Sequence, residues 1–148
     1  SIESDAAPLN GLIADVLEAA PGTRCFRDPT RGGIASTLNE FAAQSGVDIT
    51  IREDDVPVKD AVRGACNMLG YDVFQVANEG KMVCVAPADQ AEAALAAMRA
   101  HRYGADAAII GEVSEASPER GPKVFLQTGF GSKRILDMLV GEQLPRIC

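Results

Sequence analysis

The stretch GVDITIR, residues 46–52, sets the pattern that the rest of the chain follows. Val47, Ile49 and Ile51 alternate with polar side chains, which is the period of a β-strand with one buried face. Gly46 stands directly before this strand and is a typical helix end, so we expect a helix to precede it. Apolar side chains with helical spacing also follow the strand, so a second helix is expected on that side.

Helices and strands are predicted along the whole chain from the period of its apolar residues. The predicted helices cover about residues 8–20, 34–45, 55–69 and 87–101. The predicted strands cover about residues 23–26, 47–52, 81–86, 106–113, 123–128 and 134–140. Because the last strands follow one another without a helix between them, we predict an α+β fold, with helices layered on a mixed, partly antiparallel sheet.

The end of the chain differs from the part before it. No apolar period continues beyond Gly141, and Pro145 restricts Leu144 to extended conformations. We therefore expect residues 1–140 to form one domain and residues 141–148 to form a flexible tail.

Composition excludes several classes of function. The chain has 148 residues, 47% of them hydrophobic, enough for a single core. Its formal net charge of -7 and its scattered basic residues argue against a nucleic-acid partner. No apolar run approaches the roughly 20 residues that cross a membrane, and the N-terminus lacks the pattern of a signal peptide. We expect a cytoplasmic protein.

The stretch DPTRGG places two glycines at the start of the second predicted helix. Gly32 and Gly33 would let an anion approach the backbone N–H groups at the helix N-terminus, and Arg31 would add positive charge. A phosphate or a carboxylate could bind there. The alternative is structural: Asp28 or Thr30 caps the helix, and the glycines only form the turn.

Asn78 and Glu79 precede Gly80, at the edge of a predicted buried strand. A carboxylate in this position could act as a general base, whereas the alternative is an ordinary Asn-Glu-Gly turn.

His101 is the single histidine and ends an alanine-rich helix, where a cation suits the helix dipole. Nothing in the sequence brings His101 to a nucleophile, so catalytic sets that need a histidine are excluded.

Four cysteines form no CxxC pair, so neither a metal site nor a disulfide framework is expected. Cys66 and Cys84 fall at apolar positions and are predicted to be small core residues, whereas the role of Cys25 is open. Cys148 is the last residue, beyond every predicted element. It is either a reactive carrier thiol or an incidental terminal thiol.

Five motifs together resemble the C-terminal half of the HypE family of hydrogenase maturation proteins, within the AIR synthetase (PurM) superfamily. They are DPTRGG, ANEGK, IIGEV, KRILDML and GEQLPRIC. The PRIC ending is distinctive of this family, whereas the first two motifs are shared more loosely with selenophosphate synthetase and thiamine-monophosphate kinase. The sequence departs from the family in YDVFQVANEG, where a proline would be expected shortly before the second motif.

The resemblance implies a role in making the cyanide ligands of [NiFe] hydrogenases. In this family HypF loads a carbamoyl group on the terminal cysteine, and ATP with Mg²⁺ drives dehydration of the thiocarboxamide to a thiocyanate. The cyano group then passes to the HypC–HypD complex. The fold implied is that of the AIR synthetase C-terminal domain.

The resemblance also implies roles for particular residues. Cys148 would be the carrier thiol, and Glu79 would be the base, oriented by Asn78. The tail segment that delivers the thiol would comprise Pro145, Arg146 and Ile147. The residues near the nucleotide phosphates or the incoming thiocarboxamide would be Asp28, Thr30, Arg31, Gly32 and Gly33.

The family's N-terminal half, which carries the acidic ATP-binding segment and most dimer contacts, has no counterpart in these 148 residues. We therefore expect no cofactor in this piece alone and catalysis only with its own N-terminal domain, in a homodimer. Two alternatives stay open: the matching half of another PurM-superfamily ATP-dependent synthetase or kinase, and a non-catalytic module that docks on partners.

Overall fold

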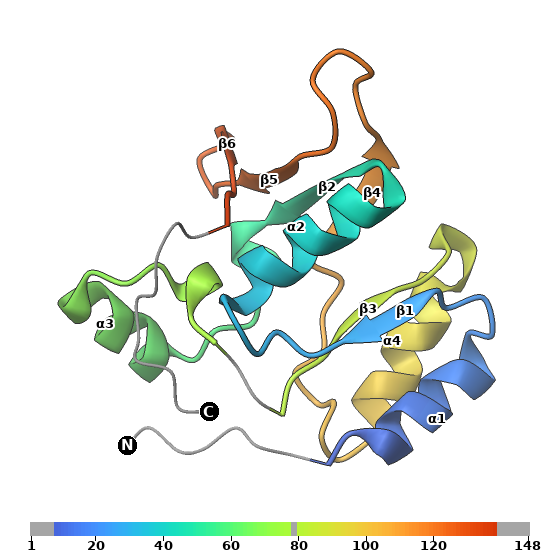
Figure 1. Ribbon diagram of the computed structural model, residues 1–148. Coiled ribbons are helices and arrows are strands. Elements are labelled where there is room, and N and C mark those ends of the chain that lie inside the picture. Colours follow the sequence, from blue (N-terminus) through green and yellow to red (C-terminus); the bar gives the residue numbers. More distant parts are fainter. Residues whose placement is uncertain (1–7, 78–79, 139–148) are drawn as a thin grey trace.

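A computed structural model describes residues 8–77 and 80–138 as helices set beside a sheet and a short ribbon of two strands (Figure 1). The helices of this part are α1 (Asn10–Ala19), α2 (Gly33–Ser45), α3 (Asp60–Leu69) and α4 (Ala91–Ala100). The strands are β1 (Cys25–Arg27), β2 (Val47–Arg52), β3 (Val83–Val85), β4 (Gly111–Glu115), β5 (Val124–Gln127) and β6 (Lys133–Ile135). Single turns of 3₁₀-helix are η1 (Glu53–Asp55), η2 (Val73–Gln75) and η3 (Ala88–Gln90).

The sheet has the strand order β4-β2-β5-β6. Strand β2 pairs antiparallel with β4 and parallel with β5, while β6 adds antiparallel to β5. Ile51 on β2 lies between Gly111 of β4 and Leu126 of β5. The prediction of an α+β fold with a mixed sheet is confirmed. The strand predicted from the stretch GVDITIR is β2, an inner strand of that sheet.

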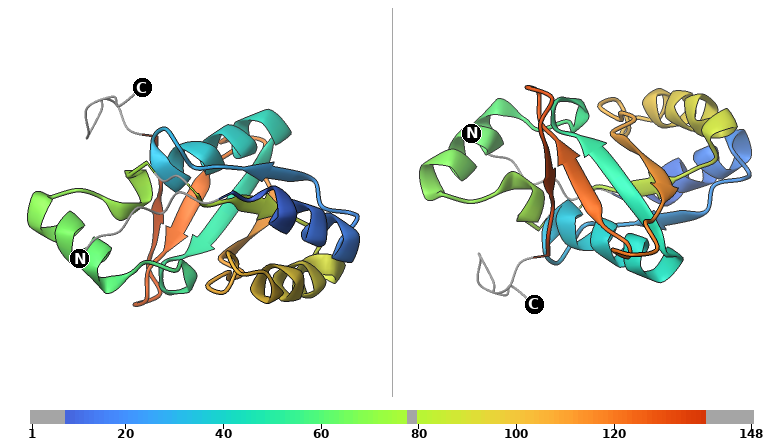
Figure 2. Two further views of the ribbon diagram at one scale, coloured as in Figure 1. Left: turned by 90° about the horizontal axis from the view of Figure 1, so that it is seen from below. Right: turned by 90° about the horizontal axis from the view of Figure 1, so that it is seen from above.

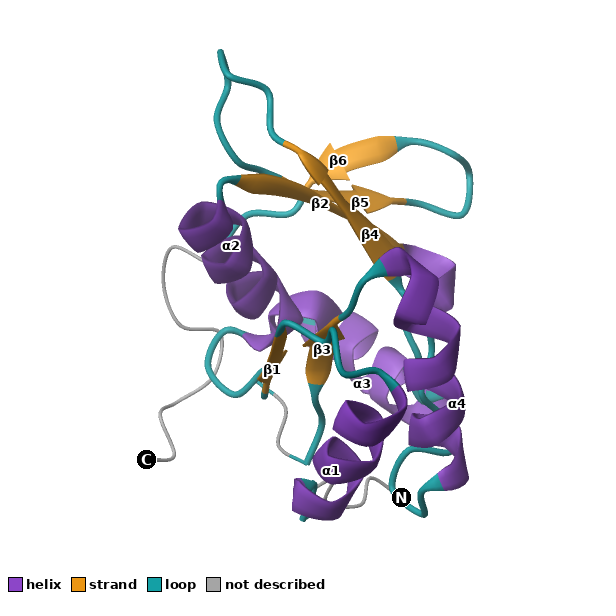
Figure 3. Cartoon of the chain, turned by 90° about the vertical axis from the view of Figure 1, so that its right-hand side faces the viewer, coloured by secondary structure: helices purple, strands orange, loops and turns teal. Residues whose placement is uncertain are grey.

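Helix α2 covers one face of the sheet, and the described helices all lie on that side (Figure 3). Seen from above, the strands are not covered by a helix (Figure 2, right). The alternation of β2 explains this arrangement, because only one of its faces is apolar. The main core contains Ala35, Leu38, Phe41, Ala42, Ile49, Ile51, Phe74, Val83, Val124, Leu126 and Leu136.

A second, smaller core lies between α1 and α4, and the β1–β3 ribbon separates it from the first. Phe26 is opposite Cys84 in the ribbon, and both pack against the second core. Cys25 is opposite Val85, and both pack against the main core. The buried residues of the second core are Leu12, Val16, Ala20 and Ala94. The ribbon is therefore apolar on both faces, and its short strands hold two groups of helices together.

Three sequence predictions differ from the structure. The strand expected over residues 106–113 begins at Gly111 and ends at Glu115, where it can pair with β2. Gly111 has no space for a side chain, since a Cβ atom would lie 2.1 Å from the Thr50 carbonyl oxygen. The run over residues 134–140 is a strand only as far as Ile135, and residues from 139 onward lie outside the described part.

Helix α3 also differs. It was expected from about residue 55, but η1 intervenes and the helix begins at Asp60. Cys66 is buried on it, as predicted, whereas Leu69, an apolar residue three positions later with helical spacing, is 66% exposed. The reason is that α3 contacts η2 and stands apart from the sheet, so its last turn projects from the body (Figure 1).

An ion pair between the exposed Arg120 and the buried carboxylate of Asp48 fixes the loop between β4 and β5. Asp48 on β2 is 6% exposed and accepts hydrogen bonds from Arg120, at 2.6 and 3.3 Å, and from the backbone N–H of Lys123, at 2.8 Å. The hydrogen bond from Arg120 is the main cause that holds the pKa of the Asp48 carboxyl below its ordinary value of 3.8.

No described helix is long and apolar enough to span a membrane.

The ion pair of Asp48 and Arg120 predicts a pH-dependent effect of Asp48→Asn. A carboxyl with a lowered pKa stabilises the fold above its unfolded pKa, and this contribution is lost as the pH falls through the folded pKa. The variant should therefore unfold at lower urea concentration than wild type at about pH 7, and the difference should shrink below about pH 4. Urea unfolding measured at several pH values checks this. An equal difference at about pH 7 and about pH 3.5 would contradict it.

Candidate functional site

Two of the motifs quoted from the sequence, DPTRGG and ANEGK, meet at one pocket. Arg27 and Asp28, at the end of β1, line it together with Gly80 and Lys81, which lead into β3. The pocket has a volume of about 300 Å³. Its apolar lining comes from α1, β1 and the residue before β3: Leu9, Ile13, Phe26 and Met82.

The register of the ribbon explains why the motifs meet. Arg27 is paired with Val83, so the chain that leaves β1 and the chain that enters β3 run side by side. The DPTRGG stretch follows the first of these, and the Asn-Glu-Gly stretch precedes the second. An antiparallel pair of strands therefore converts two motifs that are about fifty residues apart in sequence into neighbours in space.

A second contact joins the same two segments. A Cβ atom on Gly33 would lie 2.6 Å from the Val76 carbonyl oxygen and 2.7 Å from the Phe74 carbonyl oxygen. The start of α2 therefore packs directly against the backbone that precedes Asn78. Gly32 and Gly33 have φ angles of 71° and 65°, in the left-handed region that favours glycine.

The N-terminus of α2 has no side-chain cap. Gly32 is the N-cap residue, and among the described residues no hydrogen bond links the side chains of Asp28 or Thr30 to the helix. The capping alternative is therefore wrong for this helix. The first N–H groups of a helix lack partners within the helix, so those of α2 can interact with an anion.

The other sequence-predicted residues of this motif have different surroundings. Thr30 is half-buried in the turn, and Arg31 is exposed beside it. Neither of these two lines the pocket. Asn78 and Glu79 lie outside the described residues, although Gly80, which follows them, is part of the pocket lining.

Sequence reasoning assigned no role to Arg27 or Lys81, although Arg27 adjoins the DPTRGG motif and Lys81 ends the ANEGK motif. The Arg27 guanidinium forms an ion pair with Glu40 of α2 at 2.5 Å, which fixes its position at the pocket edge. The apolar lining was also missed, because the spacing of apolar residues along the sequence does not distinguish a side chain of the core from one that lines a pocket. Contacts between distant segments were needed to recognise it.

Two of the described thiols, Cys25 and Cys84, have pKa values that burial raises. Burial raises the pKa of Cys25 above its ordinary value. Burial, with a smaller contribution from Cys25, raises the pKa of Cys84 to about 11. Cys66 is buried in α3. Cys148 and the tail residues Pro145, Arg146 and Ile147 lie outside the described residues.

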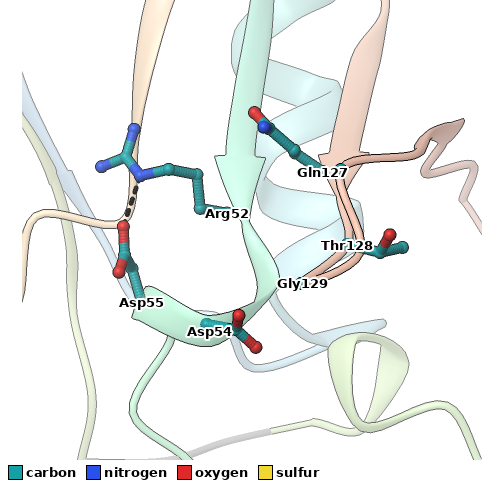
Figure 4. A pocket seen from close by; sticks show the side chains of 7 residues that line it. Arg52, Asp54, Asp55, Gln127, Thr128 and Gly129 are labelled. Carbon is teal, nitrogen blue, oxygen red and sulfur yellow. Dashed lines mark hydrogen bonds and ion pairs between the residues drawn. The ribbon is translucent and has the colours of Figure 1, made fainter.

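A second pocket, of about 220 Å³, lies where β2 and β5 end (Figure 4). Arg52 and Asp55 form an ion pair on one side of it, and Gln127 and Thr128 lie on the other. None of the predicted site residues lines this pocket. Over the described ranges, no group of three or more potential metal ligands is present. The pocket between the two motifs is therefore the candidate site.

Comparisons with known proteins identify the family of this chain. The family model described as "AIR synthase related protein, C-terminal domain" matches residues 1–121. The carbamoyl dehydratase HypE of Azotobacter vinelandii is 53% identical over 147 residues, which is 99% of this chain and 42% of that protein. The chain therefore spans less than half the length of this curated relative.

Solved structures give the same relationship. A hydrogenase maturation protein HypE in complex with ATP has a TM-score of 0.90 and 43% identity, over 98% of this chain and 44% of that chain. A HypE–HypF complex has a TM-score of 0.87 and 46% identity, over 93% of this chain and 44% of that chain. The expected fold of the AIR synthetase C-terminal domain is confirmed.

The tight contact at Gly33 predicts that alanine cannot replace this glycine. Gly33→Ala introduces the strain of a positive φ and a clash with two carbonyl groups, so we expect a loss of about 3 kcal/mol of unfolding free energy. Gly46→Ala is the matched control, because Gly46 has a φ of 66° with nothing within 4 Å of an added Cβ. The control should lose only about 1 kcal/mol. Urea unfolding measures both, and equal losses would show that the close approach at Gly33 is unimportant.

Proposed function

This chain belongs to the family of AIR synthase related proteins, as their C-terminal domain, and we propose that it is the C-terminal part of an ATP-dependent carbamoyl dehydratase. The complete protein would convert a thiocarboxamide on Cys148 to a thiocyanate and supply cyanide ligands for [NiFe] hydrogenases. The main support is the 53% identity to a carbamoyl dehydratase over 99% of this chain. The pocket shared by the two motifs supports a site for this chemistry on the same domain.

The reaction needs activation of an oxygen atom and removal of two protons. The carbamoyl oxygen is a poor leaving group until the γ-phosphoryl group of ATP is transferred to it. A base then removes the N–H protons as phosphate departs, and the carbon–nitrogen triple bond of the thiocyanate forms. We assign Glu79 as this base and Asn78 as the residue that orients it. The products are the thiocyanate, ADP and phosphate.

The segment from Asp28 to Gly33 would hold the phosphate or the activated thiocarboxamide. The N-terminus of α2, which has no side-chain cap, offers backbone N–H groups to such a ligand. Arg31 would contribute positive charge from the exposed turn, and Thr30 a hydroxyl group. At the pocket edge Arg27 is paired with Glu40, and Lys81 adds a positive charge that suits an anionic ligand.

ATP and Mg²⁺ would be bound mainly by residues that precede this chain in the complete protein. The described residues contain no group of three or more potential metal ligands. We accordingly propose that this piece alone does not hydrolyse ATP, and that the site is completed by its own N-terminal domain within a homodimer.

We assign the partners from the chemistry of the two transfer steps. A protein of the HypF type would load the carbamoyl group on Cys148, consistent with the solved complex of HypE and HypF. A HypC–HypD complex would accept the cyano group. The tail residues Pro145, Arg146 and Ile147 would carry the thiol between these sites, and all these steps would take place in the cytoplasm.

Adducts on Cys148 test the carrier role. The native protein, incubated with a HypF-type donor, carbamoyl phosphate and ATP, should first gain a carbamoyl group and then lose water from it. Peptide mass spectrometry should locate both adducts on Cys148. Cys84 is an internal control, because its raised pKa keeps it protonated and unmodified. An unmodified Cys148, or full activity of Cys148→Ser, would favour another synthetase or kinase of the same superfamily.

Glu79→Gln tests the base. The variant should accept the carbamoyl group at the wild-type rate, but its conversion to thiocyanate should slow by about 100-fold or more, the range expected for loss of a general base. Glu92→Gln, on the exposed side of α4, is the matched control and should dehydrate normally. Single-turnover mass spectrometry separates the two steps. A normal dehydration rate in Glu79→Gln would remove Glu79 from the mechanism.

A further inference from the structure

Exposed apolar side chains cluster in the segment that leads to the tail. In the described part of the chain, nine large hydrophobic residues are exposed, and three of them occur within nine consecutive residues. These are Phe130, Ile135 and Met138, with exposures of 102%, 44% and 47%. We call residues 129–138 the exit segment, because the chain continues from it directly to residues 139–148.

The tip of the exit segment is held in one conformation. The Thr128 N–H donates to the Ser132 carbonyl at 2.8 Å, and the Gly131 N–H donates to the Thr128 carbonyl at 2.9 Å. The hydroxyl groups of Thr128 and Ser132 are also hydrogen-bonded, at 2.6 Å. Gly131 has a φ of 83°, as a three-residue hairpin loop requires. This turn presents Phe130 to solvent on a pre-organised support, which lowers the entropic cost of binding through that ring.

The surface behind the tip is apolar with a positive edge. Ile135 is paired with Phe125 across β6 and β5, and both alternate with the core residues Leu126 and Leu136. They therefore belong to the opposite face of the sheet, which no described helix covers (Figure 2, right). The Lys133 ammonium group lies 5.3 Å from the centre of the Phe125 ring. Among the described residues Lys133 forms no salt bridge, although its charge acts on the more distant Asp48 carboxylate, whereas Arg134 pairs with Asp72. A complementary partner would present an apolar socket with a carboxylate at its edge.

The length of the remaining chain connects this surface to Cys148. Residues 139–148 span up to about 33 Å when extended, whereas Phe130 and Met138 are eight residues apart and thus separated by at most about 29 Å. The thiol can therefore reach any point above the exit segment. A partner seated there would have its reactive centre within reach of Cys148.

We infer that the exit segment, with Phe130 as its anchor, is the docking surface for the protein that transfers the carbamoyl group to Cys148. This inference rests on the proposed function. Docking beside the root of the tail raises the effective concentration of the thiol at the donor's site, because the two are then joined by only ten residues.

Phe130→Ala in the native full-length protein tests the inference. Removal of a central aromatic anchor should raise the Kd for a HypF-type donor by about tenfold or more, measured by titration calorimetry. Met68→Ala is the control, since Met68 is 90% exposed but lies on α3, and it should leave the Kd unchanged. Lys133→Glu, which replaces the positive edge by a negative charge, should also weaken binding and reverse the salt dependence of association.

The outcomes separate this inference from the proposed function. If wild type gains no carbamoyl group on Cys148, the proposed function fails. If wild type is carbamoylated and binds the donor, but Phe130→Ala binds it equally well, the docking inference alone is overturned. Unchanged donor binding together with a lowered melting temperature or an altered oligomeric state of Phe130→Ala would also overturn the docking inference. In that case Phe130 would be covered by the rest of the chain or by a second copy.

Discussion

The two-sided ribbon of β1 and β3 is the constraint on which the arrangement of this domain depends. Its strands have three residues each, yet one face packs against the main core and the other against the core of α1 and α4. The same pairing sets Arg27 beside Val83 and so brings the two functional motifs together. A shift of one residue would turn every ribbon side chain to the opposite core and would also displace the two motifs relative to each other by about 3.3 Å. Stability and the geometry of the site therefore depend on one register.

The glycines at the start of α2 have a role in packing, in addition to the role in ligand binding that we propose. Gly33 has no room for a side chain because the carbonyl groups of Phe74 and Val76 contact it. The helix N-terminus is thus held against the segment that leads to Asn78 and Glu79, while its first N–H groups are not capped by a side chain. One pair of glycines therefore meets a packing requirement together with the binding requirement that we propose. The alternatives posed by the sequence, an anion site or a simple turn, are not mutually exclusive.

Much of the fold could be predicted from the spacing of apolar residues along the sequence. Gly46 ends α2, Val47–Arg52 form β2, and Cys66 is buried in α3, each as its spacing indicates. Period could not locate the start of β4, because this depends on the room that Gly111 leaves beside Thr50. Nor could it predict that Leu69 would be exposed, since the contacts of α3 are set by tertiary packing. The motifs could be identified from sequence, but the pocket between them required the ribbon, which joins residues far apart in the chain.

The central claim is that the two motifs act as one site on the group carried by Cys148. Hydrogen–deuterium exchange on the native protein, with a carbamoyl group on Cys148 and a non-hydrolysable ATP analogue, tests it most directly. Our account predicts slower exchange in both residues 28–36 and residues 77–83, relative to the protein with an unmodified thiol and the same nucleotide. Unchanged exchange in both segments, or protection of only one of them, would contradict a shared site.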